Sequence, residues 1–369
     1  MSIDVICAND MSNLLNSWYV SMRDRNLEKS HALKEEIEEK IERKEENENL
    51  LLYYSLLDFR HSLLTQPFTK ADDLLIQIDI EQNGTDDMLD YYYHFFKGIY
   101  FYQQKHYEDA IKHYHFAERK LSHIPDPIET AEFHYQLASV YSQYMNVLTS
   151  IHHTLKALEI FRKDSNYQVR SADSKNLLGS NHILLGNFER AEVYLHEAIK
   201  EAQRSECQET EAISLQNLGW MYTKQDMPLK AIRYLERGLK WMVKNKEYDY
   251  QAKTMYLLAK EYFHLNEEQE AMNWIDKCYD ICQLGNNLEY LGKLTILKAK
   301  HTLDRKNYMI VLKNEISSFF DKKNWENVEE FSQVLANHYE KERNIVEAMN
   351  YYKLVIIAKN KLKLEEGLG

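Results

Sequence analysis

Cysteine and histidine, the side chains that most often ligate metals or act as nucleophiles and bases, are present here without a spacing suited to chemistry. Four cysteines stand at positions 7, 207, 278 and 282. Cys278 and Cys282 are four residues apart, a spacing that would bring both thiols to one helix face, but no nearby pair completes a metal set. His152 and His153 are adjacent and would point apart on a helix. We expect buried or idle thiols, no metal, no cofactor, no catalytic triad and no glycine-rich phosphate loop.

Composition narrows the fold class and the partners. The 369 residues include only 10 glycines and 4 prolines, and this scarcity predicts long helices joined by short connections. The formal net charge of −12 argues against a nucleic-acid partner, because phosphate contacts need a basic face. No apolar run of about 18 residues appears, and residues 1–10 lack the basic and apolar stretches of a secretion signal. We expect a cytoplasmic chain with no membrane contact.

The elements that must position any functional side chain follow a repeated pattern. In one copy, a small residue is followed at fixed spacing by an aromatic, a small, a large apolar and a small residue, namely Gly219, Tyr222, Ala231, Leu235 and Gly238. The first small residues of successive copies are Gly98, Ala138, Gly179, Gly219, Ala259, Ala299 and Ala336, so the period is close to 40 residues. We count about seven repeats, of which the copies at Ala138 and Ala299 are weak.

This order of residues resembles the tetratricopeptide repeat, a helix hairpin of about 34 residues. The roughly six extra residues per copy imply either longer helices or longer loops. A single hairpin cannot bury its apolar face, whereas stacked hairpins can, and the stack curls into a superhelix. We therefore expect a right-handed superhelical domain whose first helices line a groove for an extended peptide.

Residues 1–66 do not match the repeat and predict a three-helix bundle. Apolar residues recur at helical spacing in three stretches, which are Met11–Met22, Leu33–Ile41 and Leu50–Leu64. Pro67 would end the third helix, because proline removes an amide hydrogen bond and clashes with the preceding turn. The predicted fold is therefore all-α, with a bundle over 1–66, a linker containing a helix over 67–88 and a tetratricopeptide-like domain over 89–369.

Between Glu35 and Glu48 almost every residue is charged. The stretch fits a solvated helix face with closely spaced ion pairs or, alternatively, a docking face for a partner. A helix-turn-helix that reads DNA needs a basic recognition helix. The second predicted helix is acidic instead, so we expect no DNA contact.

Three strings in the N-terminal part carry a resemblance to a known family. They are LNSWY at Leu15–Tyr19, LKEEI at Leu33–Ile37 and LLLYYSLLDFRH at Leu50–His61. Together with the repeat of about 40 residues, they make the chain resemble, over essentially its whole length, the Rap family. This family comprises the response-regulator aspartate phosphatases of spore-forming bacilli. The string that ends in Phe59, Arg60 and His61 is the most specific part.

The resemblance implies two partners, a response regulator and a short signalling peptide. Members of the family hydrolyse the regulator's phosphoaspartate or block its DNA-binding domain. A re-imported peptide binds in the repeat groove and releases the regulator. The resemblance also implies regulator contacts at Glu45, Glu46 and Ser55. The alternative is a non-catalytic tetratricopeptide scaffold for protein interactions.

Catalytic members of the family carry a glutamine just before the Leu-Leu-Tyr-Tyr run, where its amide can orient the attacking water. Ungapped alignment places Glu48 there, which makes Glu48 the candidate catalytic position. A carboxylate about 4 Å from a phosphoryl charge costs about 4 kcal/mol at an effective dielectric near 20, and the amide donor is lost. Asn47 or Asn49 could supply an amide only if the helix register shifted. Hydrolysis and sequestration of the regulator therefore both stay open.

Asn217, two residues before Gly219, is the predicted peptide anchor. Asparagine is common there in peptide-binding repeats, and its amide both donates to and accepts from a peptide backbone. Further candidates on first helices are Asn176, Asn181, Gln216 and Lys260, and the alternative for each is a polar residue satisfied inside the repeat. Rap proteins often hold the peptide with an acidic residue near Leu184 of this chain, so either the alignment slips or the peptide differs.

Overall fold

The computed structural model describes residues 3–41, 47–65, 68–81 and 86–365. It is 86% helical, and no strand occurs in the ranges described. The prediction of an all-α fold with an N-terminal helical part and a tetratricopeptide-like part is confirmed. By packing, the chain divides into two compact units, residues 1–140 and 141–369. The boundaries at 66 and 88, drawn from the sequence repeat, stay a prediction.

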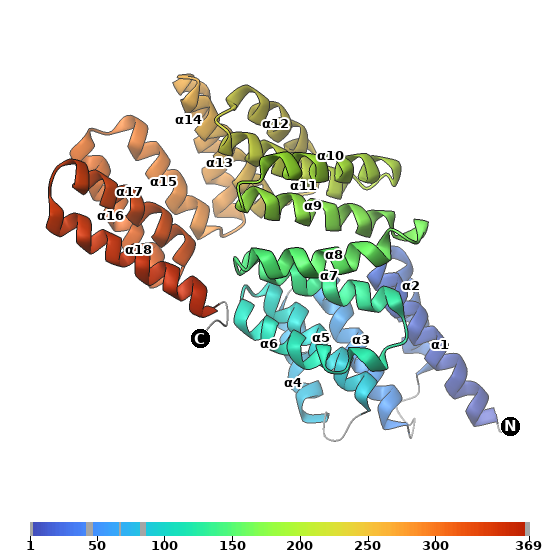
Figure 1. The fold of residues 1–369 in the computed structure, drawn as a ribbon. Coiled ribbons are helices and arrows are strands. Elements are labelled where there is room, and N and C mark those ends of the chain that lie inside the picture. Colours follow the sequence, from blue (N-terminus) through green and yellow to red (C-terminus); the bar gives the residue numbers. More distant parts are fainter. Residues whose placement is uncertain (1–2, 42–46, 66–67, 82–85, 366–369) are drawn as a thin grey trace. The chain divides into compact units, whose positions relative to one another are not determined.

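The first unit begins with three helices, α1 (Ile3–Arg23), α2 (Leu27–Lys40) and α3 (Glu48–Thr65), and α1 packs against both of the others. It continues through α4 (Phe68–Glu81), α5 (Asp87–Gln103), α6 (Tyr107–Glu118), the short helix η1 (Leu121–His123) and most of α7 (Pro127–Gln143) (Figure 1). Trp18 is completely buried, and its indole nitrogen donates to the Ser30 hydroxyl at 3.1 Å. The ring of His61 lies 5.6 Å from Trp18, centroid to centroid. The family-specific string therefore contributes to the bundle core.

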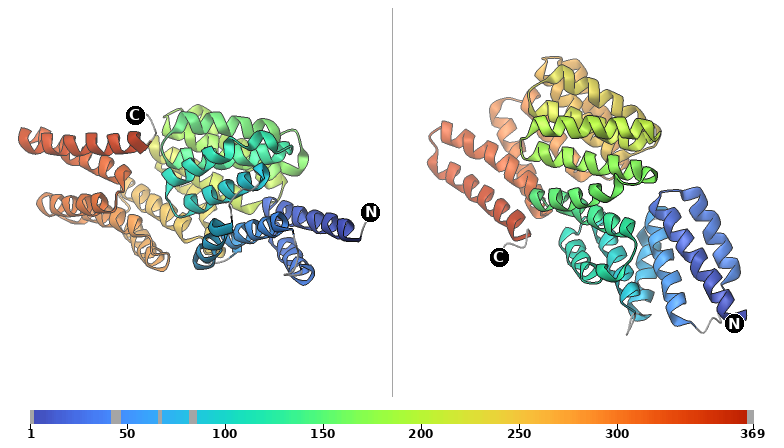
Figure 2. Two further views of the ribbon diagram at one scale, coloured as in Figure 1. Left: turned by 90° about the horizontal axis from the view of Figure 1, so that it is seen from below. Right: turned by 45° about the vertical axis from the view of Figure 1, so that its right-hand side comes forward.

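The second unit is a succession of helix pairs (Figure 2). Its elements are α8 (Val147–Phe161), η2 (Ser165–Tyr167), α9 (Gln168–Leu184), α10 (Phe188–Arg204), α11 (Gln208–Lys224), α12 (Pro228–Lys244), α13 (Tyr248–His264), α14 (Glu268–Leu284), α15 (Leu288–Thr302), α16 (Arg305–Asp321), α17 (Trp325–Lys341) and α18 (Ile345–Glu365). Helices α9 to α14 are 17 residues long each, and three-residue loops join them. Two such helices and two such loops make the 40-residue period. The residues beyond a standard tetratricopeptide repeat therefore lie in longer helices, not in longer loops.

The repeated small residues let the two helices of a pair approach closely. A Cβ atom added to Gly219 would lie 2.5 Å from Cγ of Leu235, and one added to Gly179 would lie 2.5 Å from Cγ of Leu195. Three residues after Gly219, Tyr222 stacks on Tyr234 with ring centroids 5.5 Å apart. The pattern read from the sequence is thus a packing rule, in which glycine makes room for a leucine and an aromatic ring covers the contact.

Candidate functional site

The first helices of successive pairs form one continuous surface in the second unit. Helix α9 contacts α11, α11 contacts α13, and α13 contacts α15. We call the surface made by α9, α11, α13 and α15 the first-helix surface. The predicted peptide anchor Asn217 and the other predicted peptide-binding residues lie on these helices.

Two of the predicted peptide-binding residues meet on this surface. The side-chain amide nitrogen of Asn217 donates to the amide oxygen of Asn176 at 3.0 Å. Asn217 is 6% exposed, and Asn176 is half-buried. Among the described residues, neither the Asn217 amide oxygen nor the Asn176 amide nitrogen has a partner. The pair therefore presents one acceptor and one donor, the two groups that a peptide backbone requires.

The other predicted amides are used inside the repeat stack. Gln216 is completely buried, and its amide donates to the Tyr250 carbonyl oxygen at 2.9 Å and to the Thr254 hydroxyl. Asn181 is also completely buried. It donates to Ser150 at 2.8 Å and accepts from Ser142 at 2.7 Å. Both residues join neighbouring helices, so we assign them packing roles rather than peptide contacts.

Lys260 lies exposed on α13, and sequence reasoning singled it out while missing Lys253 on the same helix. The Lys253 ammonium lies over the Trp220 ring of α11, 5.0 Å from its centroid. Burial lowers the pKa of Lys253 to about 8, and the nearby Lys293 acts in the same direction. The spacing of Lys253, Tyr256 and Lys260 places all three on one helix face. This helical spacing from Lys260 could have identified Lys253 from the sequence.

The candidate catalytic residue Glu48 and one candidate regulator-binding residue, Ser55, lie on α3. Glu48 is the first residue of α3 and is exposed. The Asn47 side chain accepts from the Leu50 amide at 3.2 Å, so this asparagine caps the helix. Ser55 is half-buried and donates to the Leu51 carbonyl oxygen of its own helix at 3.1 Å. Glu45 and Glu46 lie outside the described residues.

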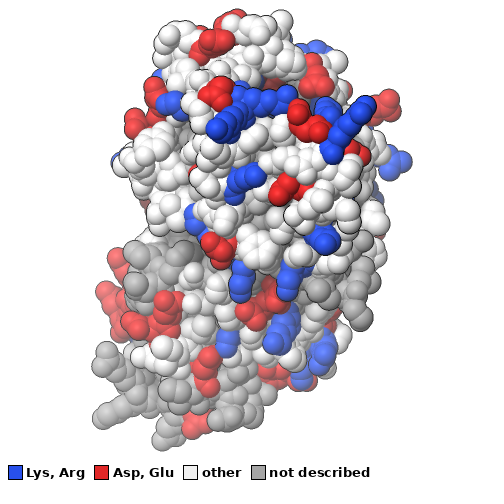
Figure 3. Space-filling view, turned by 90° about the vertical axis from the view of Figure 1, so that its left-hand side faces the viewer, with Lys and Arg blue, Asp and Glu red and all other residues white. Residues whose placement is uncertain are grey.

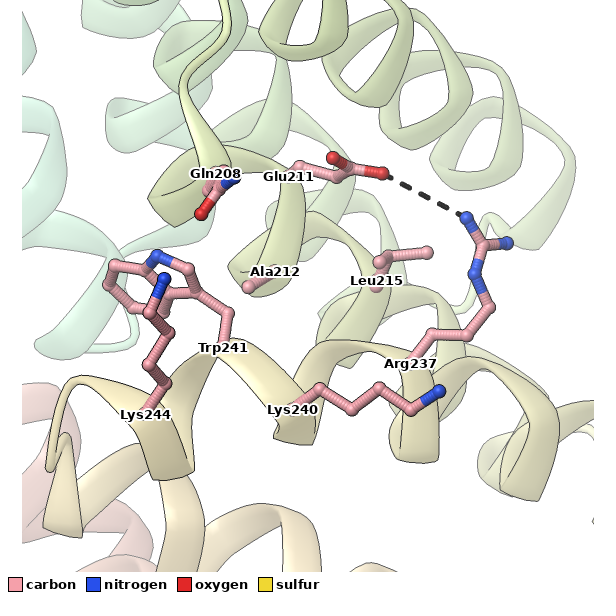
Figure 4. Close-up of a pocket in the computed structure, with 8 residues that line it drawn as sticks. All are labelled: Gln208, Glu211, Ala212, Leu215, Arg237, Lys240, Trp241 and Lys244. Carbon is pink, nitrogen blue, oxygen red and sulfur yellow. Dashed lines mark ion pairs between the residues drawn. The ribbon is translucent and has the colours of Figure 1, made fainter.

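A separate pocket of about 410 Å³ opens between α11 and α12. Its lining comprises Gln208, Glu211, Ala212, Leu215, Arg237, Lys240, Trp241 and Lys244 (Figure 4). Glu211 and Arg237 form an ion pair across it at 3.9 Å. Successive helical residues are rotated by about 100°, so Leu215 and Asn217 project in nearly opposite directions. The pocket is therefore not part of the first-helix surface.

Three other kinds of site bear on the function, namely a basic surface for nucleic acid, a metal site and a membrane-spanning helix. On the face in Figure 3, basic and acidic side chains are interspersed rather than gathered into a basic surface. Within the described ranges, no three histidine, cysteine or acidic side chains are arranged to hold a metal ion. None of the helices in the described part of the chain has the length and hydropathy that a bilayer-spanning segment requires.

Comparison with known sequences places this arrangement in a family. Residues 5–66 match the model of the N-terminal part of response regulator aspartate phosphatase H, and residues 168–242 and 252–294 match tetratricopeptide models. Response regulator aspartate phosphatase E of Bacillus subtilis (strain 168) is 32% identical over 281 residues, covering 74% of this chain and 75% of that protein. Response regulator aspartate phosphatase I of the same organism is 29% identical over 360 residues, covering 95% and 91%.

Solved structures agree with the sequence matches. A Rap protein in complex with the competence and sporulation factor is 25% identical, with a TM-score of 0.86 over 97% of this chain and 99% of that chain. The apo form of RapI is 29% identical, with a TM-score of 0.68 over 96% of this chain and 98% of that chain. From the N-terminal match, the repeats and the relative that is 32% identical, we conclude that this chain belongs to the Rap family of response regulator aspartate phosphatases.

Proposed function

We propose that this chain is a cytoplasmic Rap-type regulator, which binds a bacterial response regulator and is inhibited by a short signalling peptide held on the first-helix surface. The observation that carries the proposal is the match of residues 5–66 to the N-terminal Rap model, followed by the tetratricopeptide matches. Relatives that share most of their length with this chain are named response regulator aspartate phosphatases. A solved relative binds the competence and sporulation factor.

Support for the peptide comes from the Asn176–Asn217 pair. The Asn217 side-chain nitrogen donates to the Asn176 side-chain oxygen at 3.0 Å. The Asn217 oxygen and the Asn176 NH₂ group are then left for a ligand. Amide groups recognise peptide backbone whatever side chains the peptide carries. Neighbouring side chains of the first-helix surface would then select the sequence. We keep Asn176, Asn217 and Lys260 as peptide contacts, whereas Gln216 and Asn181 serve the packing of the repeats.

Support for the regulator comes from the bundle. We propose that the region of Glu45, Glu46, Glu48 and Ser55 contacts the regulator, and that Glu48 occupies the place of the family's catalytic glutamine. The Glu48 side chain is exposed at the start of α3, so a partner protein can contact it. A carboxylate repels a phosphoryl group and lacks the donor of an amide. We therefore propose that regulator binding is retained, while hydrolysis is slower than glutamine would allow.

The test uses response regulators of the source organism, phosphorylated with a small phosphodonor. Loss of phosphoaspartate is followed by phosphate-affinity gel electrophoresis after adding wild type, Glu48→Gln or the control Glu108→Gln. Glu108 is also an exposed glutamate in the first turn of a helix, α6, so the control matches the change in charge. We expect Glu48→Gln to hydrolyse at least about tenfold faster than wild type, which corresponds to about 1.4 kcal/mol of barrier.

Three other outcomes are distinguishable. Equal, rapid hydrolysis by wild type and Glu48→Gln would show that the argument about Glu48 is wrong and that the chain is a phosphatase. Regulator bound without hydrolysis by either protein, with loss of its DNA binding, would establish sequestration. If no response regulator binds, the proposal is wrong and the scaffold alternative stands.

A further inference from the structure

Lys253 differs from the other half-buried lysines of the first-helix surface, Lys175 and Lys293. On α9, Lys175 forms ion pairs with Glu197 at 2.8 Å and Glu201 at 2.7 Å. On α15, Lys293 pairs with Glu289 at 2.7 Å. Among the described residues, no carboxylate forms an ion pair with Lys253. Its ammonium faces the Trp220 ring instead.

The surroundings of Lys253 are partly desolvated by neighbouring aromatic rings. Trp220 covers it from α11, with the ammonium 5.0 Å from the ring centroid, and Tyr256, three residues further along α13, lies on the same helix face. The lowered pKa of Lys253, near 8, has burial as its main cause. An aromatic face attracts a cation but does not replace the hydration of an ammonium, so the site favours a ligand that brings a negative charge.

The charged groups that act on Lys253 come from two other helices, α15 and α17. The positive charge of Lys293 on α15 lowers the pKa of Lys253, whereas the carboxylates of Glu326 on α17 and Glu289 on α15 raise it. Glu289 is already paired with Lys293. Glu326 is therefore the acidic side chain that would compete with an incoming anion.

Trp220 is three residues after Asn217 on α11, so the two project from the same side of the helix. An extended ligand held by Asn217 and Asn176 would continue over Trp220 toward Lys253. We propose that Lys253 binds a carboxylate of the signalling peptide, either its C-terminal carboxylate or an aspartate or glutamate side chain. This inference rests on the proposed function and assigns Lys253 as a specificity-determining residue.

The experiment selects peptides from a random five-residue library, prepared once with C-terminal acids and once with C-terminal amides, by their retention on the full-length protein. Retained peptides are identified by mass spectrometry. They are then resynthesised as acid and amide, with each aspartate or glutamate changed in turn to its amide. Binding is measured to wild type, Lys253→Met, Glu326→Gln and the control Lys277→Met. Lys277 also lies over a tryptophan, 4.4 Å from the Trp274 centroid, but on α14 rather than on the first-helix surface.

We expect Lys253→Met to weaken binding of the retained acidic peptides about tenfold or more, the effect of losing a charge-assisted hydrogen bond, while Lys277→Met leaves it unchanged. Glu326→Gln should strengthen it. Loss on C-terminal amidation identifies the terminus as the carboxylate, and loss on changing a side chain identifies that side chain. An equal preference for acid over amide forms in wild type and Lys253→Met overturns the inference while peptide binding stands. Retention of no peptide by wild type overturns the proposed peptide control itself.

A measurement on wild type alone covers the case in which Lys253→Met does not fold. Acylation of lysines by acetic anhydride is followed by mass spectrometry between pH 6 and 10. Because its pKa is lowered to about 8, Lys253 should react more readily at pH 8 than the fully exposed lysines, and a retained acidic peptide should protect it while its amide form does not. Protection by neither form would contradict the inference.

Discussion

Glu129 is the most instructive residue to perturb, because a carboxylate near the start of α7 gathers hydrogen bonds from two other helices. It is 1% exposed. The Tyr19 hydroxyl of α1 lies 2.7 Å from both of its oxygens, and the Tyr91 hydroxyl of α5 donates at 3.0 Å. Arg23 lies 3.4 Å from it and also pairs with Asp126 at 2.7 Å. Glu129 therefore links the N-terminal bundle to the helices that follow it within the first unit.

The size of the stability change expected from Glu129 follows from the shift of its pKa. Burial raises the pKa of Glu129 from 4.5 to about 7, although hydrogen bonds from Tyr19 and Tyr91 and the charge of Arg23 act in the opposite direction. The folded chain therefore holds this proton more tightly than the unfolded chain. The corresponding stability is fully present below pH 4.5 and is lost as the pH rises through about 7. At about 1.4 kcal/mol per tenfold change in proton affinity, the loss is about 3 kcal/mol.

The perturbation is Glu129→Gln, which keeps the shape of the side chain and removes its titration. Hydrogen exchange in α1 and α7 is compared between wild type and variant at each pH from 4.5 to 8, so that the intrinsic exchange rates cancel. We expect the stability of wild type relative to the variant to fall by about 3 kcal/mol over this range, on the order of a hundredfold in the opening equilibrium. Glu108→Gln, an exposed glutamate of the same unit, controls for net charge and should follow wild type.

Parallel pH profiles for wild type and Glu129→Gln would refute this reasoning. They would mean that Tyr19, Tyr91 and Arg23 keep Glu129 ionised throughout the range and that desolvation does not dominate. A wild type that gains stability relative to the variant as the pH rises would refute it more strongly, because the sign of the linkage would be reversed.

Three further predictions concern the repeats. Gly219→Ala should lower the free energy of unfolding by about 1–3 kcal/mol, measured by urea denaturation, because its Cβ would lie 2.5 Å from Leu235 Cγ; an unchanged midpoint would contradict the packing rule. Asn217→Ala should weaken binding of the retained peptides about tenfold with little loss of stability. Asn181→Ala should instead cost about 1–3 kcal/mol of stability, because the buried Ser142 hydroxyl loses the amide oxygen to which it donates and the amide bond to Ser150 is removed. Equal effects of the two substitutions on peptide affinity would refute this division of roles.

Much of the fold could be predicted from the sequence, because helix pairing depends on local spacing. The recurrence of small, aromatic and apolar residues near every 40 positions indicated stacked hairpins. The structure packs Gly219 against Leu235, two positions of that recurrence, and adds the Tyr222–Tyr234 stack, whose second ring lies outside it. Spacing alone left the location of the extra residues open. The structure places them in 17-residue helices, since three-residue loops already suffice to reverse the chain.

The candidate site could be predicted only in part. Asn217 and Asn176, 41 positions apart, were both predicted and do meet. Gln216, adjacent to Asn217, lies on a side of α11 that α13 covers, and its amide is consumed there. Helix α11 is apolar on several sides, so its sequence does not reveal which polar residue faces a neighbour.

The sequence by itself determined the all-helical class, the repeat and the family resemblance. Tertiary structure decided which charged and polar groups lose their water. Lys253 is covered by Trp220, 33 residues away, and Glu129 by Tyr19, 110 residues away. The periodicity of the sequence predicts which face of its own helix a residue occupies. The cost of burying a charge depends on the distant residues packed over that face, and those contacts exist only in the folded chain.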